Sequence, residues 1–140
     1  MPLPPHMKFK HCAKGRPRPK AGAMNKTESE YLAYLQYRQS QGGLLFVSHH
    51  EGMKLKLADG THYTADFVVM TNSLELEIHD VKGTTRVKKI EAGVEVGKTE
   101  RPYLEGDART KLKFVAETWP IVLKVVWRCR ASGQWIEEVY

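Results

Sequence analysis

The stretch Leu76–Gly83, with the sequence LEIHDVKG, begins like an apolar β-strand and ends in charged residues. Side chains alternate between the two faces of a strand. One face of a strand over Leu74–Lys82 therefore carries Leu74, Leu76, Ile78, Asp80 and Lys82, and the other face carries Glu75, Glu77, His79 and Val81. Charged side chains are rarely buried unless they are paired or bind a ligand. The pattern indicates that Asp80 and Lys82, which continue an apolar face, have a role beyond packing.

A second aspartate, Asp66, interrupts the preceding apolar run YTADFVVM at Tyr63–Met70. A short turn at 71–73 joins the two runs, so they are expected to be antiparallel neighbours about 4.8 Å apart. Two carboxylates at that spacing can converge on a hard cation such as Mg²⁺. Lys82, on the same side, can offset their charge and orient an attacking water. These residue types suit metal-assisted phosphodiester hydrolysis. The alternative is an Asp and a Lys that reach solvent or pair with each other.

The rest of the chain alternates between helix and strand signals. A helix is expected from Asn25 until Gly42–Gly43, with Thr27 and Glu30 as its capping box. Its core stripe is expected to be Leu32 and Leu35, with Glu28 one turn earlier on the same side. Further strands are expected at Leu44–Ser48, Met53–Ala58, His62–Met70, Ile121–Cys129 and Trp135–Val139, a second helix at Asp107–Thr118, and a mobile loop or β-ribbon at Thr84–Leu104. This order predicts a mixed α/β domain with a central sheet.

The chain of 140 residues has the length of one domain and a net charge of +6. Seven Lys or Arg and no acidic residue precede Glu28, whereas the rest holds 15 basic and 16 acidic residues. Residues 1–24, rich in proline, are therefore predicted to be a flexible basic arm, and residues 25–140 the folded domain. No apolar run approaches the length of a membrane span. Cys12 and Cys129 match no zinc spacing and fit a reducing compartment.

The whole arrangement resembles the PD-(D/E)xK nuclease superfamily, in which an acid on one strand precedes acid-x-Lys on the next. The corresponding residues are Thr64-Ala65-Asp66 and Asp80-Val81-Lys82, with Glu28 on the preceding helix. More narrowly, the chain is similar to a family of small phage-encoded proteins with the elements NKTE, YTPDF, EVKG and DA…K.K..AE.YP. Here the elements are NKTE at Asn25–Glu28, YTADF at Tyr63–Phe67, HDVKG at His79–Gly83 and DARTKLKFVAETWP at Asp107–Pro120. The chain departs from the family at Ala65, where proline is usual, and at Asp80, where Glu is commoner.

The resemblance implies a restriction-endonuclease-like core, in which a central mixed β-sheet is flanked by helices in the order α-β-β-β-α-β. It also implies a Mg²⁺-dependent DNA endonuclease, with Mn²⁺ as a substitute. By the same resemblance, Asp66, Asp80 and the Val81 carbonyl ligate the metal. Lys82 activates water, and Glu28 reaches a second metal or its water. Related junction resolvases imply branched DNA as substrate, a homodimer, and a phage-encoded protein in the bacterial cytoplasm.

Three basic groups are candidate DNA contacts: Lys14, Arg16, Arg18 and Lys20 in the arm, Lys88 and Lys89 in the segment at 84–104, and Lys111 and Lys113 on the second helix. The arm sequence KGRPRPK resembles the core of an AT-hook and also suits plain electrostatic attachment to phosphates. Solvated lysines are the alternative for Lys111 and Lys113. The alternatives for the whole chain are a catalytically silent DNA-binding module and a structural or interaction protein.

Overall fold

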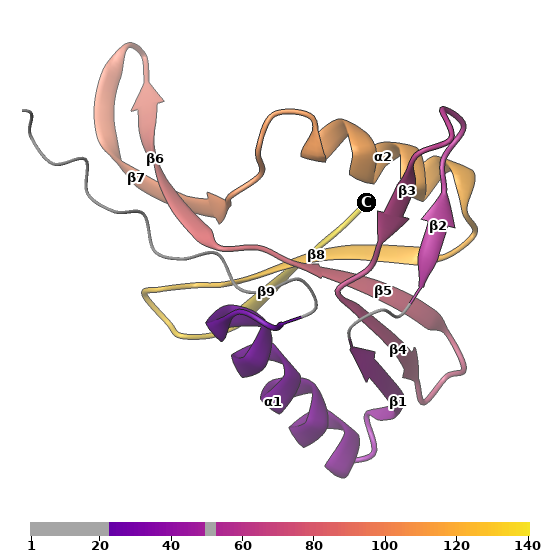
Figure 1. Ribbon diagram of the computed structural model, residues 1–140. Helices are drawn as coiled ribbons and strands as arrows, with labels where there is room; N and C mark the ends of the chain where they lie inside the picture. Colours follow the sequence, from indigo (N-terminus) through magenta and orange to yellow (C-terminus); the bar gives the residue numbers. More distant parts are fainter. Residues whose placement is uncertain (1–22, 50–52) are drawn as a thin grey trace, which may run out of the picture.

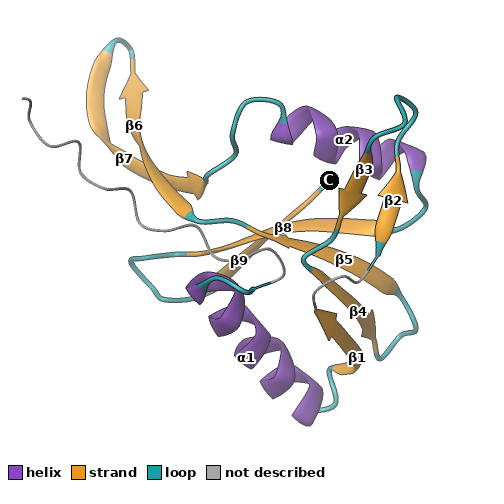
Figure 2. Ribbon diagram, in the orientation of Figure 1, coloured by secondary structure: helices purple, strands orange, loops and turns teal. Residues whose placement is uncertain are grey.

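Figure 1 shows the computed structural model, which describes residues 23–49 and 53–140. Within these residues, strands outnumber helices (Figure 2). The helices are α1 (Lys26–Ser40) and α2 (Ala108–Thr118). The strands are β1 (Leu44–His49), β2 (Lys54–Lys56), β3 (His62–Thr64), β4 (Phe67–Thr71), β5 (Leu76–Val81), β6 (Thr84–Glu91), β7 (Val94–Pro102), β8 (Val122–Arg128) and β9 (Trp135–Val139). The basic arm with Lys14, Arg16, Arg18 and Lys20 lies outside the described residues.

The central sheet has five strands in the order β1-β4-β5-β8-β9. Strands β5 and β8 are parallel, and the other neighbouring pairs are antiparallel, so the sheet is mixed as predicted. A parallel pair needs a crossover connection, and α2 forms part of the one between β5 and β8. If the two separate hairpins β2–β3 and β6–β7 are set aside, the elements run α, β, β, β, α, β, followed by β9.

Two hydrophobic clusters cover opposite faces of this sheet, and α1 and α2 lie on either side of it (Figure 1). On one face, Tyr31 and Leu35 of α1 pack against Phe67 and Val126. On the other face, Leu112 of α2, Ile78 and Leu123 belong to one cluster, which also includes Leu55 and Tyr63 of the β2–β3 hairpin. The hydrophobic core is thus divided into two layers by the sheet.

Strand β5 confirms the predicted alternation at the centre of the sheet. Ile78 belongs to the cluster beneath α2, and Val81 belongs to the cluster beneath α1. The expected strand over Leu74–Lys82 was too long at both ends. Leu74 adopts a φ of 64° and is exposed, because it belongs to the turn after β4 rather than to the strand.

The strand predicted over His62–Met70 is wrong as a single element, because the chain bends at Ala65–Asp66. The residues before the bend form β3, which pairs with β2, and those after it form β4, which pairs with β5. The backbone N–H of Ala65 donates to the Met53 carbonyl, and the Asp66 side chain accepts a hydrogen bond from the backbone of β5. Asp66 therefore lies at a change of partner strand.

The predicted capping box of α1 is also wrong. Asn25, not Thr27, is the N-cap, and its side chain accepts from the Glu28 backbone N–H at 2.9 Å. The Glu28 carboxylate accepts from the Asn25 backbone N–H at 3.1 Å and completes the box. The fully buried residues of the helix are Tyr31 and the predicted Leu35, whereas the predicted Leu32 is only partly buried against the same cluster.

The segment predicted as a loop or β-ribbon is the ribbon β6–β7, which extends away from the central sheet (Figure 1). Its tip turns at Ala92 and Gly93, both with positive φ, as a tight two-residue hairpin turn requires. None of the described helices is long and apolar enough to span a membrane.

A chain of buried polar groups links α1 to the sheet. The Tyr31 hydroxyl lies 2.7 Å from Nδ1 of His79, and Nε2 of His79 lies 2.8 Å from the Glu77 carboxylate. Lys124 Nζ lies 3.0 Å from that carboxylate and 3.1 Å from Glu137. Because buried polar groups cost free energy unless they are paired, these contacts fix the position of α1 on β5.

The Glu77→Gln variant is expected to lose a pH-dependent part of the stability. The hydrogen bonds from His79 and Lys124 lower the pKa of Glu77 from 4.5 to about 2. Because the folded-state pKa is depressed, this stabilisation is complete above about pH 4.5 and is lost as the pH falls through about 2. The wild type should exceed the variant by on the order of 3 kcal/mol at pH 7 in urea unfolding. The difference should fall by more than half at pH 3. Glu75→Gln, at an exposed position of the preceding turn, is the control. A difference that is equal at both pH values would contradict the assignment.

Candidate metal centre

Asp66 and Asp80 face each other at the end of the β4–β5 pair. Phe67 is paired with His79, so continuing this register by one residue sets Asp66 opposite Asp80. Side chains directly opposite across an antiparallel pair have Cβ atoms about 5 Å apart. Asp80 is 5% exposed and Asp66 is half-buried. The convergence of two carboxylates expected from the sequence is therefore present.

Their electrostatic environment disfavours two negative charges. Burial raises the pKa of Asp66 to about 8, and the charge of Asp80 and a hydrogen bond with it act in the same direction. The Val81 N–H, which donates to Oδ2 of Asp66 at 2.8 Å, opposes this rise in pKa. Like charges directly opposite each other destabilise a sheet. A bound divalent cation would remove that cost, so the carboxylate pair fits a metal of the Mg²⁺ type.

The Val81 carbonyl lies on the same side of β5 as Asp66. The N–H and C=O groups of one strand residue point to the same neighbour in an antiparallel pair, and the Val81 N–H is directed to Asp66. The backbone of β4 has turned away at this point, so the strand partner that Val81 would have is replaced by a side chain. Two carboxylates and this carbonyl are three oxygen donors suited to Mg²⁺.

Lys82 continues the same face of the strand and pairs with Asp80. Its Nζ lies 3.0 Å from Oδ2 and 3.2 Å from Oδ1 of Asp80, and the side chain remains 29% exposed. The pairing alternative considered from the sequence is thus observed as a contact. The site differs from an isolated Asp–Lys ion pair because a second carboxylate, that of Asp66, lies opposite Asp80.

Asp66, Asp80 and Lys82 line a solvent-connected cavity of about 370 Å³. Its other lining residues are His62, Tyr63, Thr64, Ala108, Lys111 and Leu112. Lys111, a predicted phosphate contact, thus lies at the site. Lys113 is exposed and is not among the lining residues.

Tyr63 and His62 were not predicted as site residues. The Tyr63 hydroxyl is buried and has no hydrogen-bond partner within 23–49 and 53–140. Burial, then the charges of Asp80 and Asp66, raise its pKa, which places the hydroxyl in the field of the two carboxylates. In the sequence, Tyr63 stands between the polar residues His62 and Thr64, three residues before Asp66. This alternation agrees with the structure, in which Tyr63 is the buried residue of β3 and both neighbours are exposed.

Glu28 lies close enough to Asp66 to contribute to the rise in its pKa, although it is the weakest of the causes. Its carboxylate is engaged by Asn25 in the capping box, at 2.7 Å from Nδ2 and 3.1 Å from the backbone N. The structure therefore brings Glu28 near the site without a direct contact to the carboxylate pair. Glu30, expected as the capping residue, instead binds Arg128 at 2.9 Å.

The ribbon lysines are separate from this cavity. Lys88 pairs with Glu95 at 2.8 Å and Lys89 pairs with Glu91 at 2.7 Å, and both remain largely exposed. Exposed pairs of this kind contribute little free energy and exchange partners readily. In the described part of the chain, no group of three or more His, Cys, Asp and Glu side chains is arranged to hold a metal. Any cation at Asp66 and Asp80 would therefore depend on backbone, water or substrate oxygens as well.

The Asp66→Asn variant is expected to be more stable than the wild type without metal and to lose its response to metal. An amide keeps an acceptor for the Val81 N–H and removes a carboxyl group whose raised pKa makes folding cost either an opposed charge or the uptake of a proton. Urea unfolding in EDTA should show a gain on the order of 1–2 kcal/mol. Mg²⁺ or Mn²⁺ should raise the melting temperature of the wild type but not that of Asp66→Asn. Asp59→Asn, at an exposed turn aspartate bonded to Thr61, is the control and should keep the metal response. An unchanged metal response in Asp66→Asn would exclude this site.

Comparison of the chain with protein-family models, curated proteins and solved structures found no match. The functional assignment therefore depends on the residues themselves. The combination to be explained is an opposed carboxylate pair, an adjacent lysine and a second lysine on α2, all at one open cavity.

Proposed function

We propose that this protein is a Mg²⁺-dependent DNA endonuclease that hydrolyses phosphodiester bonds, with Mn²⁺ as a substitute metal. The observation that carries the proposal is the placement of Asp66 opposite Asp80, with Lys82 on the same face. Opposed buried carboxylates destabilise a fold and are understandable where a cation binds between them. The lysines at the cavity add positive charge where a phosphate would lie.

The fold supports a restriction-endonuclease-like core within this proposal. The order α1-β1-β4-β5-α2-β8, without the two hairpins, agrees with the α-β-β-β-α-β order of the PD-(D/E)xK nucleases. The acid and the acid-x-Lys motif fall on either side of one turn, as in that superfamily. Strand β9 and the two hairpins are additions to this core.

In the proposed reaction, Asp66, Asp80 and the Val81 carbonyl would hold Mg²⁺, which would supply Lewis-acid stabilisation of charge on the phosphate. Lys82 orients the attacking water through its Nζ, while Asp80 keeps this ammonium group in place. Lys111, which lines the cavity from α2, binds a non-bridging phosphate oxygen. The buried Tyr63 hydroxyl, which has no hydrogen-bond partner among the described residues, is a further donor for a water bound at the cavity.

Further contacts to DNA are assigned to the arm and the ribbon. Lys88 and Lys89 would exchange their carboxylate partners for phosphates, and Lys14, Arg16, Arg18 and Lys20 would attach to DNA electrostatically. The proposal extends to branched DNA as the substrate and to a homodimer, because resolving a four-way junction needs two cuts. It also places the protein in the cytoplasm of a bacterial host, encoded by a phage.

Cleavage of a labelled four-way junction and of a linear duplex of the same sequence tests the proposed activity. The wild type should cut in Mg²⁺ or Mn²⁺ and not in EDTA, with the junction preferred. Lys82→Ala should lower the rate by about 100-fold or more, because it removes a charged donor at the reacting phosphate. DNA binding without cutting by folded wild type would favour the catalytically silent module. Absence of both binding and cutting would favour a structural protein.

Lys111 and Lys113 form a matched pair for testing the cavity. They lie two residues apart on α2, but only Lys111 is among the residues lining the site. Lys111→Ala should raise KM about tenfold, as expected for a lost hydrogen bond to a charged group, and Lys113→Ala should leave it within twofold. Steady-state cleavage kinetics distinguish them. Equal effects would mean that both lysines act only through long-range charge.

A further inference from the structure

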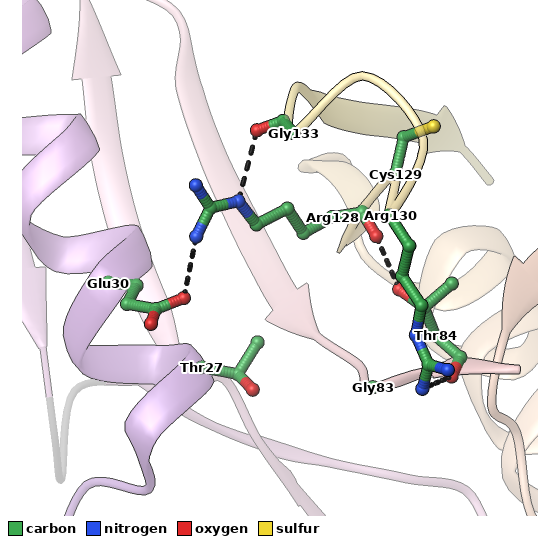
Figure 3. A pocket seen from close by; sticks show the side chains of 8 residues that line it. All are labelled: Thr27, Glu30, Gly83, Thr84, Arg128, Cys129, Arg130 and Gly133. Carbon is green, nitrogen blue, oxygen red and sulfur yellow. Dashed lines mark hydrogen bonds and ion pairs between the residues drawn. The ribbon is translucent and has the colours of Figure 1, made fainter.

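A second pocket, of about 450 Å³, lies where α1 begins and where β5 continues into β6 (Figure 3). Its third wall is the connection between β8 and β9. The lining residues are Thr27, Glu30, Gly83, Thr84, Arg128, Cys129, Arg130 and Gly133. Thus two arginines and two threonine hydroxyls surround a cavity that is separate from the carboxylate site.

Both guanidinium groups keep unused donors. Arg128 donates through Nε to the Gly133 carbonyl at 3.0 Å and through one terminal nitrogen to Glu30 at 2.9 Å. Arg130 donates to the Thr84 carbonyl at 3.0 Å. A guanidinium has five N–H groups, so most remain without a partner in the described part of the chain. Contacts through only part of each group hold the arginines in place and leave donors for an anion.

The two pockets adjoin each other along the chain. Lys82 lines the cavity of the carboxylate pair, and Gly83 and Thr84 line the second pocket. Both pockets therefore lie at the end of β5, the first with Asp80 and Lys82 and the second with Glu30 of α1. A DNA strand with a phosphate at Lys82 can continue past this end of the sheet to the arginines.

We propose that the Arg128–Arg130 pocket binds a phosphodiester group of the substrate strand next to the one that is cleaved. This inference rests on the proposed nuclease function. Guanidinium forks match the oxygens of a phosphate and bind it through two parallel hydrogen bonds. In the absence of DNA, the Glu30 carboxylate holds Arg128 in position. When the phosphate binds, it replaces Glu30 at part of the guanidinium group.

The competing explanation is that Arg128 only joins α1 to the β8–β9 connection. Exposed ion pairs contribute about 0–1 kcal/mol, and Arg128 also lies over the Trp135 ring at 5.9 Å. Arg38 offers a matched comparison elsewhere on α1. It pairs with Glu137 at 3.5 Å and lies over the Tyr34 ring at 5.8 Å, but it does not line either pocket.

The first experiment measures DNA affinity without cleavage. In the full chain carrying Asp80→Asn, binding of a labelled junction and duplex is titrated at several salt concentrations. The added double change R128Q/R130Q should weaken binding by about 30-fold or more, and reduce the slope of log K against log salt by about one to two. The Arg38→Gln control should stay within twofold, with the slope of the parent. Equal effects in the double variant and the control overturn the inference.

The second experiment uses a change expected to strengthen binding, which misfolding cannot mimic. Glu30→Gln removes the carboxylate that competes with phosphate at Arg128, so DNA should bind about three- to tenfold more tightly. Weaker binding in Glu30→Gln would show that the ion pair is structural and would overturn the inference. Titration with inorganic phosphate separates a free-anion site from a strand site. If the double variant loses phosphate binding but keeps its DNA affinity, the strand assignment is wrong.

These outcomes separate the inference from the proposed function. Wild type that cuts DNA, together with a double variant that binds and cuts normally, removes only the second phosphate site. Wild type that binds DNA through the arginines without cutting removes only the nuclease. Wild type that neither binds nor cuts DNA removes both.

Discussion

The opposition of Asp66 and Asp80 is the constraint on which the rest of the site depends. Two carboxylates meet because β4 and β5 share one register, and because the chain turns away from β5 immediately before Phe67. Because of this turn, the Val81 N–H donates to the Asp66 side chain instead of to a backbone carbonyl of the neighbouring strand. At this end, the pairing of β4 with β5 is followed by two carboxylates instead of further backbone hydrogen bonds. This arrangement lowers the local stability, and a ligand that binds both carboxylates would restore it.

Strand β5 performs two tasks on its two faces. Beneath α1, His79 is fully buried and links Tyr31 to Glu77, so the helix is fixed relative to the strand. On the opposite face, Asp80 meets Asp66 near the start of α2. His79 and Asp80 are adjacent residues of β5. The contacts that fix His79 beneath α1 therefore also fix the position of Asp80 on the opposite face. A central strand covered on both sides is well suited to this arrangement.

The sequence was informative where side-chain alternation decides the structure. The face of Asp80, its neighbour Asp66 across a turn, and the helix containing Leu112 all follow from periodicity. It was less informative where one local hydrogen bond competes with another. Asn25 and Thr27 each precede a Glu by three residues, so both fit a capping box, and the structure uses Asn25 with Glu28. The bend at Asp66 depends on the Val81 N–H, which is distant in sequence. The arginine pocket joins three separate segments, so no single motif could indicate it.

Within the residues that the structure describes, the ribbon β6–β7 is bonded to the rest of the protein near its base. Thr84 donates to the Arg128 carbonyl, and Arg130 donates to the Thr84 carbonyl and, through its backbone N–H, to Glu100, so both strands of the ribbon are bonded to the end of β8 and the residues after it. Beyond this base the two strands pair with each other. The ribbon can therefore be lengthened or shortened by paired residues, in steps that preserve its alternation, without moving Lys82. Such a change would alter how far the ribbon extends from the central sheet while the residues at its base stay in place.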